Sequence, residues 1–563
     1  MSEPEARALL EGNLAALRSA GSDLAERLCW PARSSHVGRT SDGRWLRKGM
    51  CVSLTPEELG GLEVERSGPC PSLLGVGLGE QVAWLLEASR GRRVRAWDRD
   101  PWLLRQALSV HDFREPLAQG RLELGLGSDL IDWLEQDPQA PFSRHPRLGG
   151  LYRMESALVH RGVRGPRVGI GLDQLLAEEV ADALHAEGYA VCPLDFESWS
   201  LEELDRAARR TRALGIVSIN YVPDLVGFCH ARGLRYLCWE IDPTTETRPR
   251  LEGPSQHCSV WTYRRAHVPL FEQAGFSHVG HLPLGSDPER RRPPEGEPPA
   301  GLEDLRVAFV GSSLEPEAAR ARGRLLDLYA AWHADGMAAR EDGARRLDRA
   351  LEQQAAAPER DLLEEALGAE LGAFVEHLRR RGEREDPVAL AAQLAAAQKR
   401  RRYVAALRDP GVDVWGDPGW EATAGEGVRY RGYAGHHYAL PWIYARAPIN
   451  LDIGRLYQSD IVTLRVFDVL ACGGFVLAEH SPDLDALFEV GREVESYVDL
   501  ADLRQKVTHY LAHPEQRHAI ARRGQAAVRE RHTVRARVQR ALGSWEPPAR
   551  AAPPQGDDGD ALR

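Results

Sequence analysis

The stretch SDIVTLRVFDVLACGGFVLAEH (Ser459–His480) joins a helical pattern directly to an apolar strand. Ser459 or Asp460 is a suitable N-cap, and the apolar spacing over 461–470 predicts a helix after it. A pair of glycines would end that helix before the strand FVLAE. Because the first N–H groups of a helix are unpaired and lie at its positive end, the sequence predicts an anion site near 460–462.

Two carboxylates and one guanidinium lie in this stretch. With Asp460 in the capping loop and Asp468 two turns inside the helix, the pair would bracket one elongated ligand, accepting hydrogen bonds from hydroxyl groups at each end. Arg465 lies between them and can offer two parallel donors to a phosphate. We therefore expect the wider stretch 449–480 to bind a phosphorylated ligand that also carries hydroxyl groups.

Outward from this stretch, short apolar strands alternate with helical segments along most of the chain. The strands RVGIG, GYAVCPLD, GIVSIN and LRYLCWEID follow one another from residue 167, and LRVAFVGSS restarts the pattern at residue 305. An earlier unit begins with PSLLGVG. Alternation of this kind predicts parallel sheets joined by right-handed crossovers, so the expected fold class is α/β with three Rossmann-like domains.

Composition changes suggest where the domains end. We expect a helical segment at 1–40, a Rossmann-like domain at 41–160, a second at 161–290, a Pro- and Gly-rich linker at 291–304, a third Rossmann-like domain at 305–542 and a disordered tail at 543–563. The Ala-, Leu-, Glu- and Arg-rich stretch 314–408 has three- and four-residue apolar spacing, which predicts a helical insertion in the third domain.

Composition also restricts the function. The chain has 563 residues and a formal net charge of −11, which argues against nucleic acid as a partner. No apolar run is long enough to span a bilayer, no signal peptide is recognisable and the eight cysteines form no paired motif, so we expect a cytoplasmic protein without a metal or disulfide framework. The sequence leaves the oligomeric state open.

The stretch 459–480 resembles the C-terminal domain of group 1 glycosyltransferases of the GT-B fold, and more closely their spore-maturation (CgeB-like) branch. Its residues RVFDVLACGGFVLAE carry the likeness, supported by SINYVPDL, LCWEIDP, GHLPLGSDP, VAFVGSS and YARAPINLDIGRLYQSD in the same order. The resemblance covers about 167–540. It implies two facing Rossmann-like domains, a nucleotide diphosphate sugar as donor and no required metal or other cofactor. Asp460 and Asp468 occupy the positions of two donor-binding glutamates and are one methylene shorter.

Residues that follow other strands complete the predicted site. Glu240, Asp242 and Asp460 are candidates for the catalytic base. A base from the predicted domain at 161–290 would favour inversion of the configuration of the sugar. Further predicted donor contacts are Ser312, Ser313, Arg455 and Gln458, and predicted acceptor-side residues are Asn220 and His437.

A second nucleotide site is indicated near the N-terminus. Gly75, Gly77 and Gly79 form a glycine-rich turn after the strand PSLL, and Asp98 ends the next strand, VRAWD. Such glycines let a cofactor approach the backbone, and such a carboxylate can bind ribose hydroxyls. The arrangement resembles class I S-adenosylmethionine methyltransferases, which implies S-adenosylmethionine as a possible second ligand.

The leading hypothesis is a glycosyltransferase that moves a sugar to a saccharide, protein or small-molecule acceptor. The alternatives are a methyltransferase, a bifunctional enzyme, or a catalytically inactive sugar-binding protein. The sequence leaves open the sugar, the nucleotide, the acceptor and whether configuration is retained or inverted.

Overall fold

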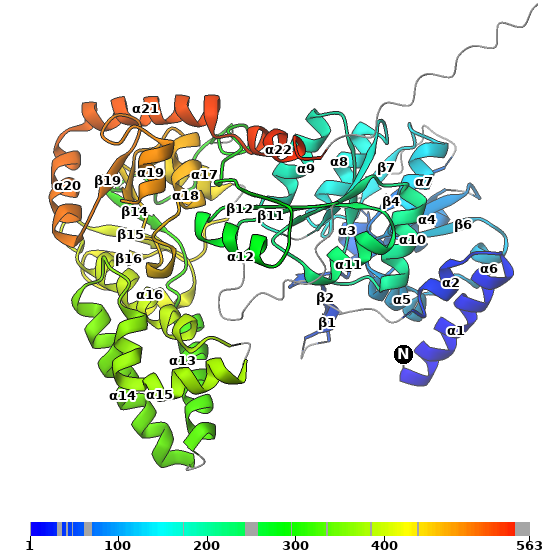
Figure 1. The fold of residues 1–563 in the computed structure, drawn as a ribbon. Coiled ribbons are helices and arrows are strands. Elements are labelled where there is room, and N and C mark those ends of the chain that lie inside the picture. Colours follow the sequence, from blue (N-terminus) through cyan, green and yellow to red (C-terminus); the bar gives the residue numbers. More distant parts are fainter. Residues whose placement is uncertain are drawn as a thin grey trace, which may run out of the picture. The chain divides into compact units, whose positions relative to one another are not determined.

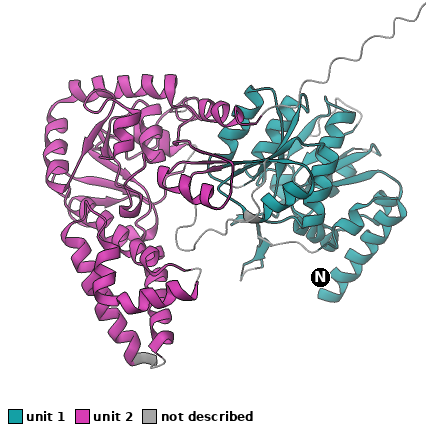
Figure 2. Ribbon diagram, in the orientation of Figure 1, with its two compact units in different colours: residues 1–238, 255–259 teal, residues 239–254, 260–563 magenta. Residues whose placement is uncertain are grey.

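The computed structural model describes residues 2–30, 37–40, 43–47, 49–60, 70–89, 91–172, 174–242, 257–293, 295–333, 336–382, 385–435 and 438–545. The chain divides into two compact units, one of residues 1–238 and 255–259 and the other of 239–254 and 260–563 (Figure 2). Each unit is described by itself.

The first unit contains a parallel sheet with the strand order β6-β5-β4-β7. Its strands are β4 (Ser72–Leu74), β5 (Val94–Asp98), β6 (Leu122–Leu126) and β7 (Phe142–Arg144), and its helices are α4 (Glu80–Ala88), α5 (Pro101–Val110), α6 (Arg114–Ala118) and α7 (Asp129–Gln136). A small antiparallel sheet of β1 (Val37–Arg39), β2 (Trp45–Arg47) and β3 (Met50–Cys51) precedes it, with α3 (Pro56–Gly60) between the two sheets in the chain.

The amphipathic N-terminus forms α1 (Glu3–Ser19) and α2 (Leu24–Arg27). Its apolar face packs on α5 and α6, where Leu14 and Leu17 join the same buried cluster as Leu104 and Leu108 (Figure 1). Asn13 is fully buried and donates to the Leu108 carbonyl oxygen at 2.7 Å. The helix therefore completes the core of the first sheet.

A second sheet follows α8 (Arg153–Arg161) and has the order β13-β12-β11-β10-β8-β9. Its strands are β8 (Arg167–Gly171), β9 (Ala190–Leu194), β10 (Gly215–Ile219), β11 (Arg235–Glu240), β12 (Cys258–Thr262) and β13 (His278–His281). Its helical elements are α9 (Ala177–Ala186), α10 (Leu201–Thr211), α11 (Pro223–Ala231), the short 3₁₀ helix η1 (Arg265–His267) and α12 (Val268–Gln273).

The third sheet lies in the second unit, and all its pairings are parallel. Its order is β16-β15-β14-β17-β18-β19, built from β14 (Val307–Val310), β15 (Val412–Trp415), β16 (Val428–Tyr430), β17 (Ile449–Leu451), β18 (Val476–Glu479) and β19 (Glu495–Tyr497). The accompanying elements are the 3₁₀ helices η2 (Pro418–Ala422) and η3 (Leu456–Gln458), with α17 (Ala439–Arg446), α18 (Leu464–Ala471), α19 (Pro482–Leu487), α20 (Leu500–Ala512), α21 (Pro514–Arg531) and α22 (Val534–Leu542).

Between β14 and β15 the chain forms α13 (Glu315–His333), α14 (Gly336–Ala356), α15 (Leu363–Arg381) and α16 (Pro387–Ala405). These helices have their own apolar core, and in Figure 1 α14 and α15 extend away from the third sheet of this unit. Tyr403 and Val404, near the end of α16, are buried in the core of that sheet. The insertion is therefore anchored to the sheet by its last helix.

The α/β class with several parallel, Rossmann-like sheets is confirmed. The unit division falls after Cys238, whereas a domain boundary was predicted at 290. The physical reason lies in contacts within the second unit: the Arg537 guanidinium in α22 donates to the carbonyl oxygens of Pro283 and Leu284 at 2.9–3.2 Å. Trp545, predicted in the tail, is 4% exposed, and the tail from 546 onward lies outside the described residues.

Candidate functional site

The strand order of the third sheet places its ligand-binding position between β14 and β17. In an open parallel sheet, ligands bind beyond the carboxyl ends of the strands, at the point where the direction of winding reverses. The chain winds from β14 to β15 and β16 on one side and to β17, β18 and β19 on the other. The reversal therefore lies between the turn at 311–313, which follows β14, and the loop at 452–458, which follows β17.

Two arginines hold the turn after β14. Arg465, in the first turn of α18, donates from Nε to the Val310 carbonyl oxygen at 2.8 Å, and Arg400 of α16 donates from Nη1 to the Ser312 carbonyl oxygen at 2.7 Å. Both guanidinium groups lie over the Phe309 ring, 4.8 and 5.8 Å from its centre. A Cβ at Gly311 would lie 2.6 Å from Arg465 Nη2, so a larger residue there would require the guanidinium to shift.

Positive charge accumulates at this turn. Burial, together with the charges of Arg465 and Arg455, lowers the pKa of Arg400 to about 9. Arg400 is 7% exposed, and its Nε has no hydrogen-bond partner within the described part of the chain. Asp452, in the loop after β17, pairs with Arg465 and accepts from the Thr463 hydroxyl at 2.6 Å. Arg400 therefore brings a buried guanidinium group with an unpaired Nε–H to the turn after β14.

The helix in the predicted anion-binding stretch begins later than expected. α18 starts at Leu464 with Thr463 as N-cap, whereas the apolar pattern predicted a start at Ile461 after Ser459 or Asp460. The preceding residues form η3, and Asp460 is drawn into an ion pair instead of capping the helix. The helix N-terminus nevertheless lies beside Asp452, because Thr463 contacts that residue.

Asp468 has a different environment from the one predicted. It lies on the buried side of α18, where Oδ1 accepts from the Ser286 hydroxyl at 2.6 Å and Oδ2 lies 2.9 Å from Arg291 Nε. Both partners come from the segment after β13, and Arg291 lies in the predicted linker. Asp460 and Asp468 therefore have separate partners, and Asp468 anchors α18 to the segment after β13.

Ser312 and Ser313 bind a carboxylate of the protein itself. Asp417 accepts from the Ser312 hydroxyl at 2.7 Å and from the Ser313 backbone N–H at 2.6 Å, and the Ser313 hydroxyl also donates to it. Although burial acts to raise it, the pKa of Asp417 is lowered, because these hydroxyls stabilise the ionised form. The serine side chains thus shape the turn.

Five predicted residues lie together at the ends of β11 and β12 and in the loop at 455–460. Arg264 donates two hydrogen bonds to Oδ1 of Asp460, from Nη2 at 2.7 Å and from Nε at 3.0 Å. Gln458 donates to the Tyr263 hydroxyl at 2.8 Å, and Arg455 Nη1 lies 3.8 Å from Asp242. The Glu240 side chain is 4% exposed and pairs with Nδ1 of His267. These contacts, all within the second unit, join the predicted base candidates to the loop after β17.

The two predicted acceptor-side residues are not brought to this cluster by any described contact. Asn220 belongs to the first unit and follows β10 with a positive φ of 64°. It lies where the winding of the second sheet reverses, since β10 pairs with β8. His437 lies outside the described residues.

Side chains of the first unit lie against the glycine turn of the predicted second nucleotide site. A Cβ at Gly75 would lie 2.6 Å from the Tyr152 ring, and one at Gly77 would lie 2.5 Å from His145 Nε2. His145 directly follows β7, and the winding of this sheet reverses between β4 and β7. Gly79 has a φ of 98° and begins α4.

Asp98, the predicted ribose ligand, is fully buried at the same place. It accepts from the Val76 N–H at 2.7 Å, the Asp100 N–H at 2.9 Å and the Tyr152 hydroxyl at 2.8 Å. Burial and the nearby Asp100 raise its pKa to about 6. Both carboxylate oxygens of Asp98 therefore already accept hydrogen bonds from groups of the protein.

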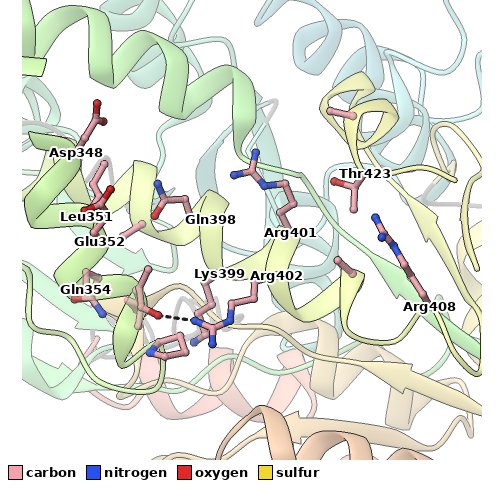
Figure 3. A pocket seen from close by; sticks show the side chains of 16 residues that line it. Asp348, Leu351, Glu352, Gln354, Gln398, Lys399, Arg401, Arg402, Arg408 and Thr423 are labelled. Atoms are coloured by element: carbon pink, nitrogen blue, oxygen red, sulfur yellow. Dashed lines mark hydrogen bonds between the residues drawn. The ribbon is translucent and has the colours of Figure 1, made fainter. Parts of the chain in front are cut away.

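A cavity of about 680 Å³ lies between the insertion and the third sheet (Figure 3). Lys399, Arg401, Arg402 and Arg408 contribute positive charge to its wall. Lys399 also pairs with Glu479, which accepts from the Gly454 N–H at 3.0 Å. The cavity is of ligand size, yet the arginines at the turn after β14 do not line it. Its lining includes Lys399 on α16, the neighbour of Arg400, and Leu456 on η3.

Sequence reasoning missed four residues of this region, namely Arg264, His267, Arg291 and Arg400. Arg400 lies in a helix that the sequence presents as ordinary insertion, and its partner is 88 residues away. The run KRRR at 399–402 was a signal, since a charged run on a helix that also packs into a core must point some cations inward. Within the described ranges, no group of three or more His, Cys, Asp or Glu residues is placed to hold a metal ion, and no helix is long and apolar enough to cross a membrane.

Comparison with known protein families gives a match for the C-terminal part. Residues 387–543, which include Arg400 and Arg465, match the family described as glycosyl transferase-like. This confirms the predicted enzyme class at the level of the family. Among curated proteins, no sequence matches the chain.

Solved structures similar to the chain are distant. A sucrose-phosphate synthase from Thermosynechococcus elongatus is 10% identical with a TM-score of 0.42, covering 68% of this chain and 98% of its own. A Rickettsia africae glycosyltransferase is 8% identical (TM-score 0.40), covering 68% and 99%. Anabaena HepE, solved with UDP-glucose, is 10% identical (TM-score 0.39), covering 68% and 99%. The substrate of this chain must therefore be argued from its own residues.

Proposed function

We propose that the chain transfers a sugar from a nucleotide diphosphate sugar to a saccharide, protein or small-molecule acceptor. The observation that carries the proposal is the group of Arg400, Arg455 and Arg465 at the winding reversal of the third sheet. Burial first, and then the charges of Arg465 and Arg455, lower the pKa of Arg400, and a bound diphosphate would offset the repulsion among the three guanidinium groups. The glycosyl transferase-like family match over 387–543 supports the same function.

The proposed mechanism uses these arginines to stabilise the leaving group. As the bond between the anomeric carbon and the diphosphate breaks, negative charge develops on the diphosphate oxygen. Arg400 and Arg465 are already held in place by carbonyl oxygens and by the Phe309 ring, so they need not reorganise during the reaction. The free N–H groups at the start of α18 add to this stabilisation.

In this proposal Asp460 and Asp468 position other parts of the protein instead of bracketing the ligand. Asp460 holds Arg264 beside the proposed substrate site, and Asp468 anchors α18 through Ser286 and Arg291. We keep the spore-maturation branch as part of the proposal, because the motif at 465–479 that carries the likeness includes Arg465 itself.

For the first unit we propose a supporting role without S-adenosylmethionine. The glycine turn faces Tyr152 and His145, and Asp98 is satisfied by protein donors. A cofactor would have to displace both rings. None of the eight cysteines, all of which lie in described ranges, forms a disulfide, which supports the proposed cytoplasmic, reducing location.

Turnover of donors tests the proposed function. The purified chain is incubated with UDP-, GDP-, ADP- and dTDP-linked sugars, and release of the nucleoside diphosphate is measured with and without a mixture of saccharide acceptors. We expect release from at least one donor, and a loss of about 100-fold or more in Arg465→Met. Arg401→Met is the matched control, since Arg401 is exposed on the same helix as Arg400. Absence of release from every donor would contradict the proposal.

A further inference from the structure

The cavity between the helical insertion and the third sheet lies within the second unit (Figure 3). Its volume of about 680 Å³ is enough for a small organic ligand. Four residues of its lining leave this space open because their side chains are single methyl groups: Ala355, Ala395, Ala405 and Ala422. Within the described part of the chain no aromatic side chain lines the cavity, so a nucleobase would have no ring on which to stack.

One face of α16 forms a wall of this cavity. The lining residues Ala395, Lys399, Arg402 and Ala405 are spaced by three or four positions, so they lie on the same side of the helix. α14 also contributes to the lining, and there the Ala355 carbonyl oxygen accepts a hydrogen bond from Arg402 Nη1. This contact holds the Arg402 guanidinium group at the wall of the cavity.

Two of the four cations at the cavity are not paired with a carboxylate among the described residues. Lys399 and Arg401 each form an ion pair with a glutamate side chain. The contact of the Arg402 guanidinium group is with a carbonyl oxygen, and that of Arg408 has no hydrogen-bond or ion-pair partner in the described ranges. Both residues are exposed, so an anion can reach them from solvent. The uncompensated charge therefore favours an anionic ligand.

The two ends of the cavity differ in their chemistry. In Figure 3 Thr423 and Arg408 lie toward one end, Asp348 and Glu352 toward the other, and Gln398 between them. Asp348 pairs with an arginine of α13 at 2.7 Å, whereas Glu352 forms no ion pair with a described residue. Guanidinium groups bind phosphate oxygens, and carboxylate and amide oxygens accept hydrogen bonds from hydroxyl groups. The arrangement thus matches a ligand with a phosphate at one end and hydroxyls at the other.

We propose that this cavity is a binding site for a phosphorylated sugar, with the phosphate at Arg402 and Arg408 and the sugar hydroxyls at Glu352 and Gln398. A phosphate suits the two guanidinium groups because they come from different parts of the chain and can bind different oxygens of one group. The site is distinct from the arginine group at the turn after β14, which does not line the cavity. The inference stands on the cavity and does not require the proposed function.

The test is calorimetry on the full chain with glucose 6-phosphate, mannose 6-phosphate and ribose 5-phosphate, each compared with the unphosphorylated sugar and with inorganic phosphate. We expect at least one sugar phosphate to bind about ten-fold or more tightly than both of its parts. Arg408→Gln should weaken this binding by about ten-fold, and it should leave the fold intact because the guanidinium group has no partner in the described ranges. Arg380→Gln, at a 70% exposed side chain of α15, is the matched control and should bind like the wild type.

Two further variants locate the ligand within the second unit. Glu352→Ala should weaken the sugar phosphate without weakening inorganic phosphate, and Arg465→Met should keep the binding because Arg465 lies at the turn after β14. If no sugar phosphate binds more tightly than inorganic phosphate, or if Arg408→Gln binds like the wild type, the inference fails. Binding that is lost in Arg465→Met and kept in Arg408→Gln would place the ligand at the turn after β14 and would also overturn it.

Discussion

Arg291 forms a buried ion pair with Asp468, with Nε 2.9 Å from Oδ2 and both side chains 6% exposed. The pair joins the segment after β13 to α18, whose first turn carries Arg465. Removing one partner of such a pair leaves the other charge buried without compensation, which costs more than the pair itself contributes.

We expect Asp468→Ala to lower the free energy of unfolding by about 3–5 kcal/mol, because the Arg291 charge stays buried. The double variant Asp468→Leu with Arg291→Met should recover most of this loss. Denaturant unfolding followed by tryptophan fluorescence measures both. Wild-type stability in Asp468→Ala would show that the ion pair has no structural role.

Gly77→Ala should destabilise the first unit by about 2–4 kcal/mol. The residue has a φ of 59°, and its Cβ would lie 2.5 Å from His145 Nε2 and 2.9 Å from the Val52 carbonyl oxygen. Gly91→Ala is the matched control, since Gly91 has a φ of 86° with open space around it and should lose only about 1–2 kcal/mol. Equal losses in the two variants would contradict the close packing at Gly77.

S-adenosylmethionine should give no binding heat with the wild-type chain at millimolar concentration, because Tyr152 and His145 occupy the space beside the glycine turn. The variant Tyr152→Ala removes the ring that a Cβ at Gly75 would meet and serves as the comparison. Binding to the wild type, measured by calorimetry and lost in Asp98→Asn, would restore the nucleotide-site hypothesis.

The second unit should lose stability as the pH falls from about 6.5 to 4. Burial and the charge of Arg537 lower the pKa of His532 to about 4, so between these values the unfolded chain binds a proton that the folded chain does not. The loss from this residue is at most about 3 kcal/mol. Thermal unfolding between pH 4 and 7 should show a weaker pH dependence in His532→Gln. His518→Gln, at an exposed position on α21, should behave like the wild type. An unchanged pH dependence in His532→Gln would contradict a neutral, buried His532.

Much of the fold follows from local pattern, whereas the site depends on distant pairs. The strands after residue 167 and the amphipathic N-terminal helix are visible in the sequence because burial imposes their apolar periodicity. The start of α18 was predicted wrongly because Asp460 and Thr463 are both acceptable N-caps, and tertiary contacts distinguish them: Asp460 pairs with Arg264 and Thr463 contacts Asp452. Such a pair spans 196 residues and leaves no local signal.

Dependence on distant contacts also explains why the positions of the arginines could be predicted only in part. Arg465 was predicted to bind phosphate from its place beside a helix N-terminus, and its contact with the Val310 carbonyl oxygen puts it at the turn after β14. Arg400 follows Lys399 directly on α16, and helical geometry directs the Arg400 side chain to the turn after β14 and that of Lys399 toward Glu479. The sequence alone cannot show which of four consecutive cations faces the site.

Binding of a nucleoside diphosphate tests the central claim most directly. Calorimetry compares UDP, GDP, ADP and dTDP with their monophosphates, using the wild-type chain, Arg400→Met and Arg401→Met. We predict that at least one diphosphate binds at least ten-fold more tightly than its monophosphate, that Arg400→Met abolishes this difference, and that Arg401→Met preserves it. If no diphosphate binds more tightly than its monophosphate, or if Arg400→Met leaves the preference unchanged, the arginine group is not a diphosphate site.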